Sequence, residues 1–349
     1  MTINVGIVGF GYAAATFHAP LIASVEGLRL AAIASSNAAK VHAAWPDVPV
    51  CESPEALIAR PDIDLIVLPT PNETHHPLAV KVLAAGKHLV VDKPFTLDTS
   101  EAYDLIERAE SAGRLLSVFH NRRWDADFLT VQRLLASDEL GRLTQFESHF
   151  DRYRPRVRVR WRESEAPGSG LWYDLGAHLI DQALCLFGLP QTIALDLARQ
   201  RDGAVTDDWF HAVLRYDALR VVLHASALVA DLGPRFALHG TRGSYIKFGL
   251  DPQEDALKAG IAPGGLGWGD DPSPGVLTVA AQQGQTGLIK RDYASARGDY
   301  ASYYAAVRDA IVQGTPNPVP ATDALQVIRL IELGMASFAE GRVVTVATS

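Results

Sequence analysis

The feature that most constrains this chain is a glycine-rich turn directly after its first apolar run. The run is Val-Gly-Ile-Val at residues 5–8, and a helical segment follows the turn. The turn consists of Gly9, Phe10, Gly11, Tyr12, Ala13 and Ala14. Gly9 permits a tight turn, Gly11 leaves the backbone open to close approach, and Ala14 replaces a third glycine where helix and strand pack. A strand, such a turn and a helix in this order predict an α/β fold with a parallel sheet.

Short apolar runs alternate with longer mixed segments over the first third of the chain. Strands are expected at residues 4–8, 28–34, 65–68, 88–91 and 115–119. Helices are expected at 77–85 and 100–112, where apolar residues recur every three or four positions and where Gly86 and Gly113 provide the stops. Continuously apolar strands are buried on both faces, so residues 1–121 are predicted to form a doubly wound parallel sheet, a Rossmann-type domain.

The pattern changes after residue 121. Strands separated by turn-like segments are expected at residues 143–150, 193–198, 210–216, 220–227 and 235–240. Helices are expected at 128–135, 171–187, 301–313 and 322–341. The Gly- and Pro-rich stretch 250–286 is expected to be a long surface loop. Residues 122–349 are therefore predicted to form an α+β domain with a large, mainly antiparallel open sheet.

Composition and charge limit the class of protein. A chain of 349 residues exceeds what one hydrophobic core usually organises, which agrees with two domains. The 48% hydrophobic and 21% charged residues are typical of a globular enzyme, and the net charge of -8 argues against binding to nucleic acid or to an anionic membrane. Cys51 and Cys185 are isolated, so we expect neither disulfides nor a cysteine-based zinc cluster. Because neither a signal peptide nor an apolar run of about 18 residues is visible, the chain is expected to be cytoplasmic.

The glycine-rich turn has the form of a dinucleotide-binding fingerprint, in which a pyrophosphate meets backbone N–H groups at a helix N-terminus. NAD sites usually carry an acidic residue at the end of the second strand, which binds the ribose 2′-hydroxyl. This chain has Ser35, Ser36 and Asn37 there, with Lys40 in the following turn. Hydroxyl and ammonium groups suit a 2′-phosphate, so NADP is slightly favoured over NAD. The alternative is that residues 35–37 only cap the next helix.

Asp92, Lys93 and Pro94 follow the strand expected at 88–91. Open parallel sheets bind ligands at the carboxyl ends of their strands. A lysine there can donate a hydrogen bond to a substrate oxygen and assist a proton transfer. The alternative is an ordinary surface lysine after a strand.

A second group of polar residues lies in the helix expected at 171–187. Asp174 and His178 are four residues apart and so share one helix face, with Asp181 about one turn further on. A carboxylate beside an imidazole fixes the imidazole tautomer and stabilises its protonated form, as a general acid–base pair requires. The alternative is an exposed pair that adds slightly to helix stability.

Together these motifs resemble those of the Gfo/Idh/MocA family, named for glucose-fructose oxidoreductase and inositol dehydrogenase. The family combines an N-terminal fingerprint, a Glu-Lys-Pro tripeptide and an Asp-x-x-x-His helix. Here Asp92 replaces the glutamate, which shortens the side chain but keeps its charge. Residues 118–125 are similar to the branch that includes NADP-dependent scyllo-inositol dehydrogenases. The resemblance implies hydride transfer between NADP or NAD and a secondary hydroxyl or ketone of a cyclic polyol or sugar.

The resemblance also implies roles for individual residues. Lys93 is expected to polarise the substrate oxygen, His178 to accept the hydroxyl proton, and Asp174 to orient His178. Substrate contacts are expected from these three residues and from Trp161 and Arg162, which precede the approach to Asp174. No metal ligand is expected. The expected cofactor contacts are Gly9, Phe10, Gly11, Tyr12, Ala13, Ser35, Ser36, Lys40, Pro69, Thr70, Asn72, His75, Asp92, Lys93, Asn121 and Arg123.

Other patterns leave their interpretation open. Arginine occupies every second position from 152 to 162, so an extended chain would place these guanidinium groups on one side. A solvated or subunit-facing edge is favoured there over an anion site. Tyr300, Tyr303 and Tyr304 either bind hydroxyl groups or pack as buried aromatics.

The resemblance implies a homodimer or homotetramer, which an exposed face of the antiparallel sheet would suit. Two rival functions are an NAD-dependent glycoside-cleaving enzyme and a non-catalytic NAD(P)-sensing regulator. The joint presence of Lys93, Asp174 and His178 argues against the regulator, because sensing needs no proton-transfer groups.

Overall fold

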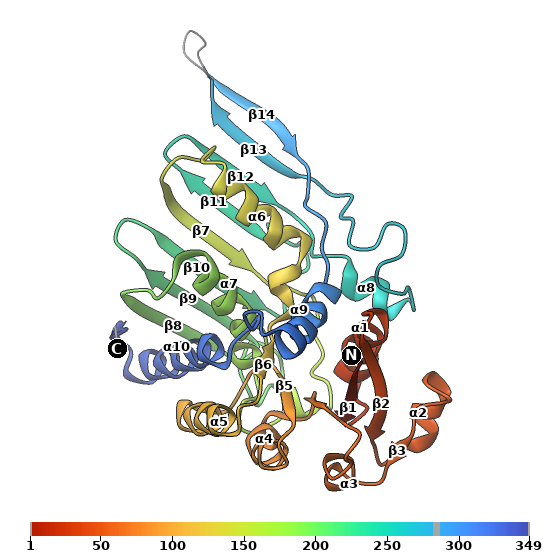
Figure 1. Cartoon of the computed structure of the whole chain (residues 1–349). Helices are drawn as coiled ribbons and strands as arrows, with labels where there is room; N and C mark the ends of the chain where they lie inside the picture. Colours follow the sequence, from red (N-terminus) through yellow and green to blue (C-terminus); the bar gives the residue numbers. More distant parts are fainter. Residues whose placement is uncertain (1, 282–286, 348–349) are drawn as a thin grey trace. The chain divides into compact units, whose positions relative to one another are not determined.

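The computed structural model describes residues 2–281 and 287–347, and the chain divides into two compact units (Figure 1). The first unit comprises residues 1–124, 252–268 and 299–325, and the second comprises 125–251, 269–298 and 326–349. The first segment of this unit ends at residue 124, close to the predicted boundary after residue 121. Residues 252–268 and 299–325, which were predicted to lie in the second domain, also belong to the first unit. Within the described ranges, no helix combines the length and the apolar character needed to cross a membrane.

A parallel sheet forms the core of the first unit. Its six strands lie in the order β3-β2-β1-β4-β5-β6, and each neighbouring pair runs parallel. The strands are β1 (Ile3–Val8), β2 (Leu28–Ala34), β3 (Val50–Cys51), β4 (Leu65–Leu68), β5 (His88–Asp92) and β6 (Leu116–Phe119). The predicted doubly wound sheet is confirmed, and only the short β3 was not predicted. Strand order reverses between β1 and β4, which creates the switch point at which such sheets bind ligands.

Helices connect the parallel strands of the first unit, as parallel pairing requires. The connecting helices are η1 (Ala14–His18), α1 (Ala19–Ser24), α2 (Ala38–Ala44), α3 (Pro54–Ile58), η2 (Asn72–Thr74), α4 (His75–Ala84) and α5 (Thr99–Ala112). The unit also contains η3 (Asn121–Trp124), α8 (Gln253–Lys258) and α9 (Ala301–Gln313). Asp98 caps α5 by accepting a hydrogen bond from Glu101 N, and Gly113 ends it at a φ of 59°. The helices predicted at 77–85 and 100–112 are confirmed with small shifts at their ends.

The second unit is built on a nine-stranded sheet in the order β14-β13-β12-β11-β7-β10-β9-β8-β15. Its strands are β7 (Leu143–His149), β8 (Thr192–Ala198), β9 (Trp209–Arg215), β10 (Arg220–Ser226), β11 (Phe236–Gly240), β12 (Gly243–Lys247), β13 (Gly275–Ala280), β14 (Leu288–Tyr293) and β15 (Val344–Thr345). All neighbours pair antiparallel except β7 and β10, which run parallel. The predicted mainly antiparallel sheet is therefore confirmed.

Helical segments accompany this sheet. They are α6 (Ala126–Ala136), η4 (Trp161–Glu163), η5 (Trp172–Gly176), α7 (Ala177–Phe187) and α10 (Ala321–Glu340). Figure 1 shows α6 and α7 on one face of the sheet. The alternating burial of β10 agrees with this arrangement, because Val221, Leu223 and Ala225 are buried while His224 between them is part-exposed.

The prediction of one long loop over residues 250–286 is wrong in part. The stretch contains α8 and β13, while residues 282–286 lie outside the described residues. Helix α8 is too short for periodicity to reveal it, and contacts distant in sequence hold it. The Gln253 side chain donates to Trp124 O at 3.1 Å and accepts from Tyr300 N at 2.7 Å.

Glu254 in α8 joins that helix to the glycine-rich turn of the same unit. Its carboxylate accepts hydrogen bonds from the Tyr12 hydroxyl at 2.8 Å and from Arg122 Nη2 at 3.0 Å, and Lys258 Nζ lies 3.0 Å away. Burial favours the neutral acid, but the positive charges and hydrogen bonds outweigh it and lower the pKa of Glu254 to about 2.

Glu254→Gln tests this contact. The pKa of Glu254 in the folded chain lies below its usual value of 4.5. The ionised carboxylate therefore stabilises the fold above pH 4.5, and this stabilisation is lost as the pH falls toward 2. At neutral pH the variant should lose about 2 kcal/mol of unfolding free energy in urea titrations. The difference in unfolding free energy between the variant and wild type should narrow as the pH falls from about 5 to about 3. Asp255→Asn, an exposed carboxylate in the same helix, should show neither effect, and a gap independent of pH would contradict the assignment.

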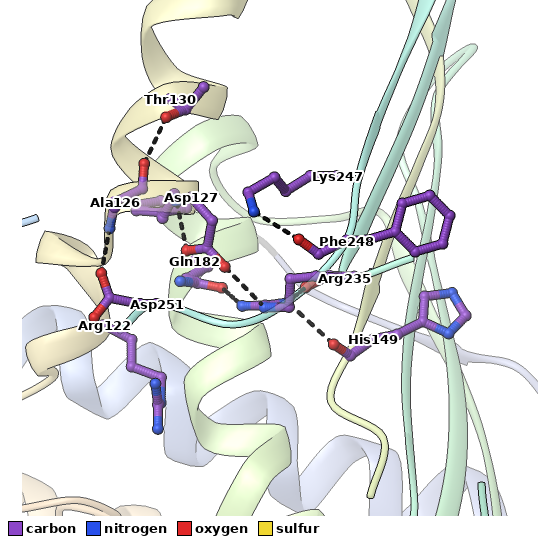
Figure 2. A network of polar contacts seen from close by, with 12 residues as sticks. Arg122, Ala126, Asp127, Thr130, His149, Gln182, Arg235, Lys247, Phe248 and Asp251 are labelled. Atoms are coloured by element: carbon purple, nitrogen blue, oxygen red, sulfur yellow. Dashed lines mark hydrogen bonds and ion pairs between the residues drawn. The ribbon is translucent and has the colours of Figure 1, made fainter. Parts of the chain in front are cut away.

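A buried ion pair ties helices of the second unit to its sheet (Figure 2). Arg235, just before β11, has its Nε 3.3 Å from Asp127 Oδ2 of α6 and donates from Nη2 to Gln182 Oε1 of α7 at 2.8 Å. It also donates to the Ser148 hydroxyl, and its guanidinium lies 4.1 Å from the centre of the Phe236 ring. The Arg235 and Asp127 side chains are 2% and 0% exposed, so neither charge has water as an alternative partner.

Arg235→Met should therefore leave a buried carboxylate without its cation. The expected loss is about 3–5 kcal/mol of unfolding free energy at neutral pH. Arg242→Met removes an exposed arginine paired with Asp138 and should cost less than about 1 kcal/mol. Urea unfolding measures both losses. Equal losses of unfolding free energy in the two variants would contradict the claim that the buried pair stabilises the fold more than the exposed one.

Candidate active site

The glycine-rich turn lies at the carboxyl end of β1. Gly9 has a φ of 88° and donates its N–H to Ala34 O at 2.7 Å, which joins the end of β1 to the end of β2. A β-carbon placed at Gly11 would meet no atom within 4 Å, so the space beside this backbone is open. The helical segment η1 starts at Ala14. An open backbone before a helix N-terminus is the arrangement that accepts a pyrophosphate, so the residues present fit a dinucleotide.

Exposed polar groups follow the end of β2. Lys40 Nζ donates to Phe10 O at 2.9 Å and lies 5.8 Å from the centre of the Phe10 ring, so its ammonium reaches the glycine-rich turn. Asn37 caps α2 by accepting from Lys40 N at 2.9 Å, which is the alternative reading of this segment. Ser36 is exposed and Ser35 is part-exposed. Asn37 N also donates to Ser35 Oγ at 3.1 Å, so the Ser35 hydroxyl takes part in the capping turn, and the preference of this segment for a 2′-phosphate stays a prediction.

Asp92 ends β5 and Lys93 follows it at the same sheet edge, and the two residues are 7% and 9% exposed. Asp92 Oδ1 accepts a hydrogen bond from Lys93 N at 2.7 Å, and Asp92 Oδ2 lies 3.7 Å from His18 Nε2. The other ring nitrogen of His18 lies 2.6 Å from the Tyr304 hydroxyl. Sequence reasoning missed His18 because no local motif marks it, and its contact with Tyr304 spans 286 positions.

The three tyrosines are buried aromatics, which decides between their two sequence interpretations. Tyr300, Tyr303 and Tyr304 are each 0% exposed. The Tyr303 hydroxyl donates to Ser117 Oγ at 2.9 Å. Burial raises the pKa of both Tyr303 and Tyr304, so their hydroxyls stay protonated. The Tyr303 and Tyr304 rings pack against Phe119 at the end of β6, with ring centres 5.0 and 5.8 Å apart.

His75 joins the segment after β4 to the segment after β5. Its Nε2 lies 2.9 Å from Thr70 O and its Nδ1 lies 3.0 Å from Pro94 O, where the Lys93–Pro94 peptide bond is cis. The ring is fully buried, and burial lowers the pKa of His75 despite these carbonyl contacts. We therefore expect it to act on the predicted cofactor site by positioning its neighbours.

The remaining predicted cofactor contacts lie in the same unit. Pro69 and Thr70 directly follow β4, and Asn72 is 2% exposed at the start of η2. Asn121 is buried at the start of η3. Arg123 lies 3.3 Å from Asp323 and donates to Pro318 O at 3.4 Å, so much of its hydrogen-bonding capacity is used within the fold.

Asp174 lies in a π-helical turn of the second unit. The helix predicted over 171–187 is helical throughout, but η5 gives its first turns π-helical geometry before α7 begins. Trp172 N donates to Asp207 Oδ2 at 2.7 Å, and a β-carbon at Gly170 would lie 2.0 Å from Asp207 Oδ1. Burial raises the pKa of Asp207, against hydrogen bonds that lower it. Asp207 and the close approach at Gly170 fix this turn, and π-helical turns are frequent at functional sites.

His178 lies in the first turn of α7 and is 6% exposed. Asp181, one turn further on, is 2% exposed. Asp174 Oδ1 lies 3.3 Å from Arg162 Nε, an ion pair that sequence reasoning did not predict. The Arg162 guanidinium also lies 4.5 Å from the centre of the Trp161 ring. Trp161, Arg162 and Asp174 therefore form one contiguous group.

A pocket of the second unit includes Asp174 in its wall. Its charged lining residues are Arg152, Arg154, Arg160, Arg162, Arg201, Glu163, Asp174 and Asp207. Four of the six alternating arginines thus line this pocket, while Arg156 and Arg158 are exposed, and the expectation of a solvated or subunit-facing edge stays a prediction. The segment leaves the sheet after Arg154, whose N donates to Ala227 O at 2.7 Å, and then turns into η4. Strict alternation ends there, so the guanidinium groups do not share one outer side.

Both parts of the chain match known family descriptions. Residues 3–120 match "Oxidoreductase family, NAD-binding Rossmann fold", and residues 132–346 match "Oxidoreductase family, C-terminal alpha/beta domain" of the Gfo/Idh/MocA proteins. The chain is 54% identical over 335 residues to an uncharacterized oxidoreductase, YdgJ, of Escherichia coli, covering 96% of each chain. It is 38% identical over 346 residues to scyllo-inositol 2-dehydrogenase (NADP(+)) IolW of Bacillus subtilis, covering 98% of this chain and 96% of that one.

Solved structures agree with these matches. An oxidoreductase structure from Yersinia pestis has a TM-score of 0.95 and 54% sequence identity, and the alignment covers 100% of this chain and 98% of that one. A Klebsiella pneumoniae oxidoreductase has a TM-score of 0.93 and 51% identity over 100% and 97% of the two chains. With its glycine-rich turn, its buried lysine after β5 and both domains matched, this chain belongs to the Gfo/Idh/MocA family of NAD(P)-binding oxidoreductases.

Proposed function

We propose that this protein is a dehydrogenase that interconverts a secondary hydroxyl and a ketone of a cyclic polyol or sugar. The observation that carries the proposal is Lys93, a nearly buried lysine at the same sheet edge as the open glycine-rich turn. The relative named scyllo-inositol 2-dehydrogenase (NADP(+)) supports the substrate class and the preference for NADP. NADP or NAD, when bound, supplies the hydride acceptor for oxidation and the hydride donor for reduction.

The proposal gives each polar residue one task. Lys93 donates a hydrogen bond from its ammonium to the reacting oxygen, which stabilises the negative charge that develops there. His178 accepts the hydroxyl proton during oxidation and returns it during reduction. Asp174 orients His178 and the substrate, and Arg162, 3.3 Å from Asp174, limits the rotation of that carboxylate.

Residues around Lys93 place it for this task. The Asp92 carboxylate accepts the Lys93 backbone N–H at 2.7 Å and lies 3.7 Å from His18 Nε2, and Tyr304 contacts the other ring nitrogen of His18. His75 fixes the next peptide through Pro94 O. The backbone at Lys93 is thus anchored on both sides. A general acid or hydrogen-bond donor is effective only when its position is held to within a fraction of an ångström.

Lys93→Met and His178→Asn test the assignment once a substrate is known. A panel of inositols and aldoses, assayed with each nicotinamide by absorbance of the reduced cofactor, identifies that substrate. Each variant should lower kcat by about 10²–10⁴-fold, because a hydrogen-bond donor or a proton acceptor is lost from the transition state. Binding of NADPH, followed by its fluorescence, should change little for His178→Asn. Lys81→Met, which removes an exposed lysine paired with Glu55, is the control. Near wild-type turnover in either variant would refute its role.

Ser35→Asp tests the cofactor preference. A carboxylate at the end of β2 repels a 2′-phosphate and can accept a hydrogen bond from a 2′-hydroxyl. The ratio of kcat/KM for NADP to that for NAD should fall by at least about tenfold, which corresponds to about 1.4 kcal/mol. Ser111→Asp adds the same charge at an exposed position of α5 and should leave the ratio unchanged. An unchanged ratio in Ser35→Asp would show that Ser35 lies away from the adenosine ribose.

A further inference from the structure

Two histidines and an aspartate meet on the sheet of the second unit, on the face opposite the buried residues of β10. His149 ends β7, and His224 lies directly across from it in the parallel register of β10. Asp151 follows two positions after His149, so both side chains point to the same side. The side chains of His149, Asp151 and His224 are 21%, 9% and 15% exposed. All three lie within one unit, and the proposed oxidoreductase chemistry uses none of them.

The distances among these three side chains are those of groups that share one ion. Asp151 Oδ1 lies 3.4 Å from His224 Nε2, and Asp151 Oδ2 lies 3.6 Å from His149 Nδ1. One donor atom from each residue can be chosen so that all lie within 4.8 Å of one another. Zinc binds nitrogen and oxygen ligands at about 2.0–2.1 Å, so two ligands at a tetrahedral angle are about 3.4 Å apart.

Hydrogen bonding inside the cluster is incomplete among the described residues. Asp151 Oδ1 and His224 Nδ1 are both buried, and neither has a hydrogen-bond partner in that part of the chain. The contact between Asp151 and His224 meets the distance of an ion pair but does not form a hydrogen bond. A buried carboxylate oxygen without a donor is costly. A cation between the side chains would remove that cost.

Glu147 supplies the outer contact that metal-binding histidines usually make. Its Oε2 lies 3.2 Å from His149 Nε2, the ring nitrogen that does not face Asp151. Gln145 Nε2 donates to the other oxygen of Glu147 and so orients it. A ligating imidazole normally donates its second N–H to a carboxylate, which fixes the tautomer. His149 therefore has Nδ1 directed at the cluster and Nε2 directed at a carboxylate.

We propose that His149, Asp151 and His224 bind one divalent transition-metal ion of the zinc class, with a remaining coordination position open to water. Two imidazoles and a carboxylate are nitrogen and oxygen ligands that suit zinc better than calcium or magnesium. The ion would join β7 to β10 just before residues 152–162, the segment in which every second residue is arginine. There Phe150 N donates to His224 O and Arg152 N donates to Ser226 O, each at 2.9 Å. Its role would be to hold that segment in place.

Metal titration of the untagged full-length protein tests the proposal. The protein is stripped with a chelator and titrated with Zn²⁺ against a chromophoric competitor, and with Co²⁺ to record visible d–d absorption. We expect one ion per chain and the strong absorption of a four-coordinate cobalt site. His224→Gln and Asp151→Asn should weaken binding at least about 10–100-fold, and Glu147→Gln about 10-fold through loss of the outer contact. His239→Gln, which removes another histidine of the same sheet paired with Ser244, should bind like wild type.

Thermal unfolding gives an independent measurement. An ion that binds only the folded chain raises Tm, so Zn²⁺ should raise Tm for wild type and His239→Gln but not for His224→Gln. Absence of stoichiometric Zn²⁺ and Co²⁺ binding by wild type would overturn the proposal, whether or not the variants fold. Unchanged affinity in a folded His224→Gln protein would also overturn it. In either case the cluster would be an ion-pair network of His149 with Asp151 and Glu147.

Discussion

The common direction of the strands in the first unit determines where its chemistry lies. Because β1, β2, β4 and β5 run parallel, the segments that follow them all emerge at one edge. Gly9 N–H bonds to Ala34 O and so joins the first two segments, while His75 contacts Thr70 O and Pro94 O and joins the other two. The four segments are thus joined in two pairs at this edge, and the backbone that carries Lys93 is restrained there.

The second unit fixes its polar groups mainly through charge. Arg201 lies 3.0 Å from Glu163 and 2.9 Å from Asp208, and Arg162 lies 3.3 Å from Asp174. Each such contact restrains two side chains that lie outside the strands of the sheet. The Arg201 pairs are buried, so removing one partner would leave the other charge without compensation. The π-helical turn at Asp174 adds a backbone restraint to this set of ion pairs.

Much of the fold and the main motifs could be predicted from the sequence, because they depend on local patterns. Apolar runs marked the parallel strands, and glycine marked both the turn after β1 and the end of α5 at Gly113. Contacts between distant residues left no such pattern. His18 beside Asp92, Arg162 beside Asp174 and the return of α8 to the first unit each depend on chain segments that meet only in the folded state. The site roles of Lys93 and His178 stay predictions.

The parallel pairing of β7 with β10 has a consequence for how the large sheet assembles. Some strands of the sheet join their neighbours through local antiparallel connections, as β9 does with β10 and β11 with β12, but β7 pairs only with the distant β10 and β11. A parallel pair cannot be closed by a hairpin, and here the paired residues Gln145 and Arg220 are far apart in the chain. The antiparallel sets β8-β9-β10 and β11-β12 can therefore form early from nearby residues, whereas β7 joins β10 and β11, and β15 joins β8, only through closure of long loops. Folding speed should be governed by these long-range closures.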